Sequence, residues 1–221
     1  ASKMTGSVYR RLALGVKKLI YPGPAEPPYA HVCQIGDPVL REKSLPIPDE
    51  DLGQPYIQNI VQQLKVVMKS YKILGLAACQ IGIPLRVVAF DFAQDIAKDL
   101  PEKSLKSLQL DRDKILVVMN PVLAVTNYDR VKRSEYCASV KGYSAVVPRY
   151  AGISLEGTYG DGTPCSIQGT GLLARVIQHE MEHLDGNLYV DTMDVSTFQN
   201  DGWQKINSFA GKVQINFLPE K

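Results

Sequence analysis

Residues 178–186 of this chain read QHEMEHLDG and contain an H-E-x-x-H pentad, His179-Glu180-Met181-Glu182-His183. Two histidines at this spacing lie one turn apart on a helix, so both imidazoles can bind one metal ion, and the glutamate between them can act as a general base. A catalytic zinc-type site uses three protein ligands and keeps one position for water. The pentad therefore predicts a metal-dependent hydrolase whose third ligand lies elsewhere in the chain.

The chain after the pentad offers few candidates for this third ligand. Metzincins continue with H-x-x-G-x-x-H, and Tyr189 stands here where a histidine is required. A gluzincin needs a later glutamate, and the only one after Glu182 is Glu220, near the end of the chain. An aspartate ligand remains open, from Asp185, Asp191, Asp194 or Asp201. The only other histidine, His31, lies next to the N-terminal arm.

An upstream cysteine is the better candidate. Cys137 lies in SEYCASV, a stretch of small and polar residues between strand-like runs. A thiolate at this point would be a strong ligand for Zn²⁺ or Fe²⁺. The alternative is an ordinary buried cysteine with no metal, which is common in proteins.

Three blocks in chain order resemble the signature motifs of the peptide deformylase family. GLAACQIG (75–82) is similar to G-L-A-A-x-Q, EYCAS (135–139) to E-G-C-x-S, and QHEMEHLDG (178–186) to Q-H-E-x-D-H. Shorter similarities occur in CQIGDPVLR (33–41), VMNPVL (118–123) and VVPR (146–149). The resemblance covers roughly residues 31–207 and is closest to the mitochondrial-type branch.

The resemblance implies a role for each of nine residues. The metal ligands would be Cys137, His179 and His183, with water in the fourth position. Glu180 would be the general base, and the oxyanion would be stabilised by the Gln80 side-chain amide and the Ala138 backbone N–H. Leu74, Gly75 and Tyr136 would bind substrate, whose backbone would lie along residues 134–136 as an added strand. The cofactor would be one divalent metal ion, Fe²⁺ in the first place, with Zn²⁺, Co²⁺ or Ni²⁺ as alternatives.

The implied function is removal of the formyl group from the N-terminal formylmethionine of newly made polypeptides in the mitochondrial matrix, with release of formate. The partners would be these nascent peptides and the ribosome exit region, with no nucleic acid and no membrane span; the protein could be a monomer or a homodimer. Tyr136 replaces the glycine of the family motif, so a weakly active or non-catalytic peptide-binding homologue is one alternative. An H-E-x-x-H metalloprotease that does not need Cys137 is another.

Two further features of the motifs need a structural test. Glu135 and Arg149 could pair beside the cysteine or form an ordinary surface ion pair. Glu182 replaces the usual aspartate of the third motif, and we expect it to face outward and to matter little.

The pentad belongs to the clearest predicted element, a helix over residues 170–185 that ends at Gly186. Its apolar positions lie on one face, together with the two histidines and Glu180: Leu172, Leu173, Val176, Ile177 and Leu184. Four residues should face outward: Arg175, Gln178, Glu182 and Asp185. The expected face would bury two imidazoles and a carboxylate, and a bound cation would offset the cost of that burial.

The remaining patterns predict an α+β domain with mixed or antiparallel sheets packed around this helix. A second helix should follow Pro55, because YIQNIVQQLKVVMKSYK has apolar residues at helical spacing. Residues 85–92, 114–126 and 143–159 have strand character, and the turn YGDGTP should connect the last of them to CSIQG in a hairpin. Residues 93–113 are charged and irregular and predict a surface insertion.

The composition fits one globular catalytic domain. The chain has 221 residues, 45% of them hydrophobic, and its net charge of +2 gives no argument for nucleic acid. We expect residues 31–221 to form the domain and residues 1–30 a basic, proline-rich arm or targeting remnant. Four dispersed cysteines without a C-x-x-C pair favour a reducing compartment. Apolar residues of the C-terminal tail (Phe209, Val213, Ile215, Phe217 and Leu218) should cover the core or a partner subunit.

Overall fold

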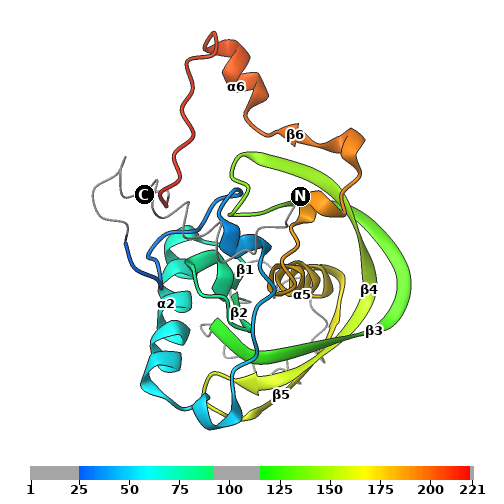
Figure 1. Ribbon diagram of the computed structural model, residues 1–221. Coiled ribbons are helices and arrows are strands. Elements are labelled where there is room, and N and C mark those ends of the chain that lie inside the picture. Colours follow the sequence, from blue (N-terminus) through cyan, green and yellow to red (C-terminus); the bar gives the residue numbers. More distant parts are fainter. Residues whose placement is uncertain (1–24, 92–114, 220–221) are drawn as a thin grey trace, which may run out of the picture.

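The structure is a computed structural model that describes residues 25–91 and 115–219 (Figure 1). The expected surface insertion at 93–113 and the arm up to residue 24 lie outside these residues. None of the described helices is both long and apolar enough to cross a membrane.

Six strands of the described residues form one antiparallel sheet. They are β1 (Gly75–Ala77), β2 (Val87–Asp91), β3 (Ile115–Tyr136), β4 (Tyr143–Tyr159), β5 (Pro164–Thr170) and β6 (Gln199–Asn200). The order is β1-β2-β3-β4-β5, and β6 pairs with the start of β4. The expected hairpin between residues 143–159 and CSIQG is confirmed as β4 and β5.

The longest pairing in this sheet is a ribbon, residues 122–136 of β3 against residues 144–156 of β4. Figure 1 shows both strands curving together around α5 (Gly171–Leu184). Register shifts lie at the base of the ribbon and near Asn127, and such irregularities increase the bend of a strand pair. The tip of the ribbon carries the EYCAS motif, so the curvature brings this motif back over the helix.

Two further α-helices and five 3₁₀ turns complete the described chain. The helices are α2 (Pro55–Tyr71), as predicted from its apolar spacing, and α6 (Trp203–Ser208). The 3₁₀ turns are η1 (Pro38–Arg41), η2 (Asp49–Asp51), η3 (Ala78–Ile81), η4 (Tyr189–Asp191) and η5 (Val195–Thr197). The expected end of α5 at Gly186 is also confirmed: its φ is +77°, and a Cβ there would lie 2.8 Å from the Arg41 carbonyl oxygen.

Two apolar clusters hold the two long helices, one for α5 and one for α2, against the sheet. The first packs Leu173, Ile177 and Leu184 of α5 against Ile153 and Ile167 of the sheet. The second lies between α2 and the opposite face of strands β1, β2 and β3. The sheet therefore lies between the two helices, and α5 is fixed along most of its length. Burial of this kind contributes about 25 cal/mol for each Å² of apolar surface.

Three orientations predicted for α5, those of Arg175, Gln178 and Leu172, are wrong. Arg175 and Gln178 were expected to face outward and are only 6% exposed, whereas Leu172, expected inside, is 37% exposed. Buried polar groups are tolerated where they form hydrogen bonds. The Gln178 amide bonds both backbone groups of Tyr150, and Arg175 has acceptors on the ribbon.

The C-terminal tail does not cover the core as one of our alternatives required. Phe209, Ile215, Phe217 and Leu218 are exposed, and Val213 is half-buried. The tail returns to the end of α2, where the Tyr71 hydroxyl donates to the Phe217 carbonyl oxygen at 3.0 Å.

Candidate metal centre

Cys137, His179 and His183 converge in a buried cluster. One ligand atom from each of them lies within 4.8 Å of the other two, and the Cys137 Sγ lies 3.2 Å from the His183 Nε2. The cysteine comes from the tip of the ribbon and both histidines from α5. Two ligands of a tetrahedral ion with Zn–S and Zn–N bonds of ordinary length lie about 3.6 Å apart. The donors are therefore spaced to hold one ion of this size.

The second ring nitrogen of His179 and the protonation state of His183 both fit a metal site. His179 Nδ1 lies 3.1 Å from Glu135 Oε2, so Nε2 is the nitrogen that remains for a metal ion. A carboxylate on the other ring nitrogen is the usual support of a metal-binding histidine. Burial lowers the pKa of His183 well below its usual value, which favours the neutral imidazole that a metal ion requires.

Glu135 is the centre of a buried ionic network. It accepts from Arg149 Nε at 2.9 Å and Nη2 at 2.8 Å, and from Arg175 Nη1 at 2.6 Å. Burial alone would raise the pKa of Glu135, but the hydrogen bonds from Arg149 and His179 outweigh it and hold the pKa at about 2. The expected Glu135–Arg149 pair is confirmed and is buried, which excludes the surface alternative.

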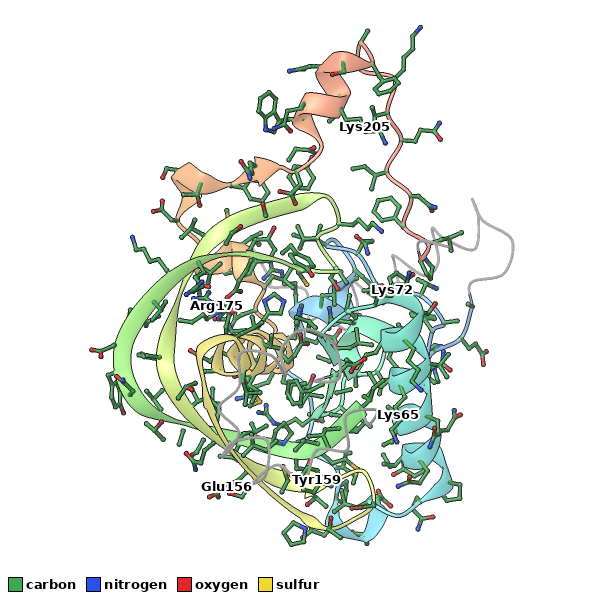
Figure 2. All side chains as sticks on the ribbon, turned by 180° about the vertical axis from the view of Figure 1, so that it is seen from behind. Lys65, Lys72, Glu156, Tyr159, Arg175 and Lys205 are labelled. Atoms are coloured by element: carbon green, nitrogen blue, oxygen red, sulfur yellow. The ribbon has the colours of Figure 1, made fainter. Side chains whose placement is uncertain are left out.

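Two more charged residues of α5 belong to this network. Arg175 also donates to the Val147 and Val131 carbonyl oxygens, at 2.9 and 2.5 Å, and Figure 2 shows it between α5 and the ribbon. Glu182 Oε1 lies 2.5 Å from Arg149 Nη1, so the prediction that Glu182 faces outward and matters little is wrong. The network ties the ribbon to α5 on the side of His179.

Glu180 lies in a niche that a larger neighbour would close. It is 3% exposed, and its Oε2 forms no hydrogen bond within the described part of the chain. A Cβ built on Gly75 would lie 2.8 Å from both the Cδ and the Cγ of Glu180, so only glycine leaves room for this carboxylate. Burial raises the pKa of Glu180 to about 7, although the positive charges of His179 and Arg149 oppose this rise.

Gln80 is oriented by its own loop. Its Oε1 accepts from the Ala77 N–H at 2.8 Å, and its Nε2 donates to Ser139 Oγ at 3.1 Å and lies 3.6 Å from Cys137 Sγ. The amide N–H groups therefore face the cluster. The Ala138 N–H, next to the cysteine, forms no hydrogen bond with any described residue. Two donors thus stand beside the candidate metal position.

A cavity of about 120 Å³ opens onto the cluster. Eight of the nine predicted site residues line it: Leu74, Gly75, Gln80, Tyr136, Cys137, Ala138, His179 and Glu180. The ninth, His183, is behind them in the cluster. Tyr136 does not fill the cavity, because its side chain is 66% exposed. Its backbone is a paired strand residue without a positive φ, so the fold does not require glycine here.

Sequence reasoning missed two lining residues, Ile73 and Arg175. Arg175 carried a signal, since it precedes His179 by one helical turn and such residues share a face. The two residues that give the cavity an apolar wall, Leu172 and Val176, were placed on the helix but not assigned to substrate. Three buried donors of the kinds that Zn²⁺ and Fe²⁺ prefer, with a carboxylate oxygen free beside them, fit a catalytic divalent metal.

Comparison with known proteins agrees with this geometry. The family model for polypeptide deformylase matches residues 29–199. The chain is 40% identical over 185 residues to the mitochondrial peptide deformylase of Homo sapiens, covering 84% of this chain and 76% of the human protein. It is 36% identical over 168 residues to the chloroplastic peptide deformylase 1A of Solanum lycopersicum, covering 76% of this chain and 61% of the tomato protein.

Solved structures of deformylases share the fold. The crystal structure of a peptide deformylase from Synechococcus elongatus in complex with actinonin has a TM-score of 0.63 at 26% identity, over 86% of this chain and 92% of that one. A probable peptide deformylase from Synechococcus phage S-SSM7 has a TM-score of 0.59 at 28% identity, over 73% and 98%.

Proposed function

The chain belongs to the peptide deformylase family, and we propose that its buried cluster binds one divalent metal ion with which it removes the formyl group from N-terminal formylmethionine. The observation that carries this proposal is the convergence of Cys137, His179 and His183 beside the niche of Glu180. When bound, the ion would lower the pKa of a water molecule and polarise the formyl carbonyl. The products are formate and a free amino terminus.

Glu180 moves the protons. Its Oε2 takes a proton from the attacking water and later gives it to the leaving amine, because this oxygen has no hydrogen-bond partner among the described residues. Burial favours the protonated form of Glu180 and the bound cation would favour the ionised form, so the group is suited both to accept and to release a proton. Gly75 keeps the niche open, and α5 fixes the carboxylate one residue after a ligand.

Gln80 and Ala138 stabilise the negative oxygen that develops on the attacked formyl group. The Ala77 N–H holds the side-chain oxygen of Gln80, which keeps its Nε2 directed at the cluster. The Ala138 N–H is the second donor. Glu135 acts through His179, because its carboxylate fixes which imidazole nitrogen faces the ion.

The cavity receives the substrate methionine. Leu74, Leu172 and Val176 give it an apolar wall, which suits a flexible thioether side chain. The peptide backbone lies between residues 73–75 and the β3 edge at 134–136 as an added strand. Backbone hydrogen bonds do not depend on side-chain identity, so this mode accepts many nascent sequences.

Cellular context completes the proposal. In this proposal the chain acts on nascent polypeptides near the ribosome exit in the mitochondrial matrix. The mitochondrial location is supported by its 40% identity to the mitochondrial peptide deformylase of Homo sapiens. Fe²⁺ is the native ion in this proposal and Zn²⁺, Co²⁺ or Ni²⁺ are its substitutes, since a thiolate and two imidazoles suit all four.

The test is formate release from a formyl-Met peptide by metal-loaded protein purified without oxygen, with elemental analysis of the same sample. The Glu180→Ala variant, with equal metal content, is the control. No release above this control would overturn the proposal. Turnover that is near zero in the natural chain and restored by Tyr136→Gly would instead identify a peptide-binding homologue, the alternative that exposed Tyr136 motivates.

A further inference from the structure

One edge of the ribbon is open. β2 pairs with β3 only at residues 115–119, and no described strand pairs with the same edge from residue 122 to 136. The outer edge of β4 is covered instead, by β5 at residues 152–158 and by β6 at residues 143–144. The site cavity borders the end of the open β3 edge, at Ser134 and Tyr136.

The hydrogen bonds of β4 identify which β3 residues face that edge. Val146 bonds the Thr197 hydroxyl and the Asp194 N–H, and Tyr150 bonds Gln178. Even-numbered residues of this part of β4 thus direct their backbone groups away from β3. Because directions alternate along a strand, the odd-numbered residues of both strands bond one another. The backbone groups of residues 132, 134 and 136 therefore face the open edge.

The same alternation places two cations on opposite faces of β3. Glu135 points toward α5, where it contacts His179 and Arg175, and Arg133 lies on that face because side chains repeat every two residues. Lys132 lies on the other face, with its Nζ 3.8 Å from Asp194 Oδ2. Arg133 is exposed and forms no ion pair with any residue that the structure describes.

We propose that Arg133 selects an acidic side chain at the third residue of the substrate. This inference rests on the proposed function, with the methionine side chain in the cavity and the peptide added to the β3 edge. The methionine then lies opposite Glu135, on the α5 face. The second residue lies opposite Ser134 with its side chain on the other face, and the third lies opposite Arg133 on the α5 face.

The direction in which the peptide leaves the cavity follows from the side on which the open edge of β3 continues. Beyond Cys137 the strand ends in the tight turn of residues 138–142, whereas toward Arg133 the edge runs on. A second cavity of about 390 Å³ lies on the turn side, and its lining includes Lys72 and Lys141. A peptide leaving through that cavity would meet Lys141 and not Arg133, so the two paths differ in the cation that they contact.

The experiment compares three amidated peptides, formyl-Met-Ala-X-Ser with X as glutamate, alanine or lysine, through kcat/KM for formate release. An exposed charge pair changes affinity by up to about fivefold. We expect the natural chain to prefer glutamate over lysine by roughly three- to tenfold, mainly through KM, because one residue attracts Arg133 and the other repels it. This preference should fall as salt is raised.

Three charge-reversal variants test which cation causes the preference for glutamate over lysine. Arg133→Glu should invert the preference to lysine, while Lys132→Glu, the matched control one residue away on the other face, should retain it. An unchanged preference in Arg133→Glu overturns the proposal, as does an inversion in Lys141→Glu. If Arg133 had only a structural role, Arg133→Glu would lower kcat/KM equally for all three peptides. That result would also contradict the proposal.

Failure of the proposed function gives a different result. In that case no peptide releases formate, the alanine peptide included. The selectivity is then read from binding of the deformylated peptides Met-Ala-Glu-Ser and Met-Ala-Lys-Ser by calorimetry, which does not require turnover. Equal affinity for the two peptides would overturn the role of Arg133 independently of catalysis.

Discussion

Replacing Glu135 by glutamine removes the negative charge that two buried arginines share. Glu135, Arg149 and Arg175 have side chains that are 6%, 4% and 7% exposed. Arg149 keeps a carboxylate partner in Glu182, but within residues 25–91 and 115–219 Arg175 keeps only the two backbone carbonyl oxygens of the ribbon. Breaking a buried ion pair by removing one partner costs about 3–5 kcal/mol. We expect Glu135→Gln to lower the free energy of unfolding by about 3 kcal/mol, the low end of this range, because glutamine still offers a hydrogen-bond acceptor.

The measurement is urea unfolding of protein kept metal-free with a chelator, because a bound ion would add its own stabilisation. The matched control is Asp191→Asn, the same change of carboxylate to amide in the Arg41–Asp191 pair, whose side chains are 41% and 36% exposed. The control should lose less than about 1 kcal/mol. A loss of about 3 kcal/mol is a large part of the roughly 5–15 kcal/mol that stabilises an ordinary domain.

A double substitution tests the reason for the loss. If the cost of Glu135→Gln comes from the charge left on Arg175, then adding Arg175→Met should restore part of the stability. Two results would refute the reasoning. One is a loss of unfolding free energy below about 1 kcal/mol for Glu135→Gln alone. The other is a double variant whose loss of unfolding free energy equals the sum of the losses of the two single variants.

Three further predictions concern the site. Gly75→Ala should displace Glu180 and lower kcat about 100-fold while elemental analysis finds the metal content unchanged; full activity would contradict the niche. Gln80→Ala should lower kcat about 10²- to 10³-fold with little change in metal content, measured by formate release, and a change in KM alone would argue against an oxyanion role. Cys137→Ser should lose the ion on dialysis, whereas Cys165→Ser, a buried cysteine of the first apolar cluster, should retain it; equal retention would exclude Cys137 as a ligand.

The periodicity of apolar residues was sufficient to predict the bounds of the two long helices, but not those of the ribbon. α2 and α5 lie within a residue or so of their predicted bounds, because each has one clear apolar stripe. β3 was expected to end near residue 126 and continues to Tyr136. Residues 127–134 are all exposed, so their mostly polar sequence lacks the alternation that identifies a half-buried strand.

The site shows a similar division between what spacing can and cannot predict. Spacing alone placed His179, Glu180 and His183 on one face of a helix, but it could not bring Cys137 to them, because that contact depends on the curvature of the ribbon. The family resemblance identified the cysteine. Arg175 was misplaced because a rule that puts charges outside does not anticipate a buried carboxylate 40 positions away.

The open edge of β3 also has a consequence for the protein itself. The edge that we propose for peptide binding offers the same unpaired backbone groups to the β3 edge of another copy, and such pairing is the first step of aggregation. Arg130, Lys132 and Arg133 stand close together on this stretch. Two such edges side by side would bring these cations together, and like charges on adjacent strands repel. Charge repulsion would therefore oppose pairing between two copies of the ribbon while the β3 edge stays unpaired.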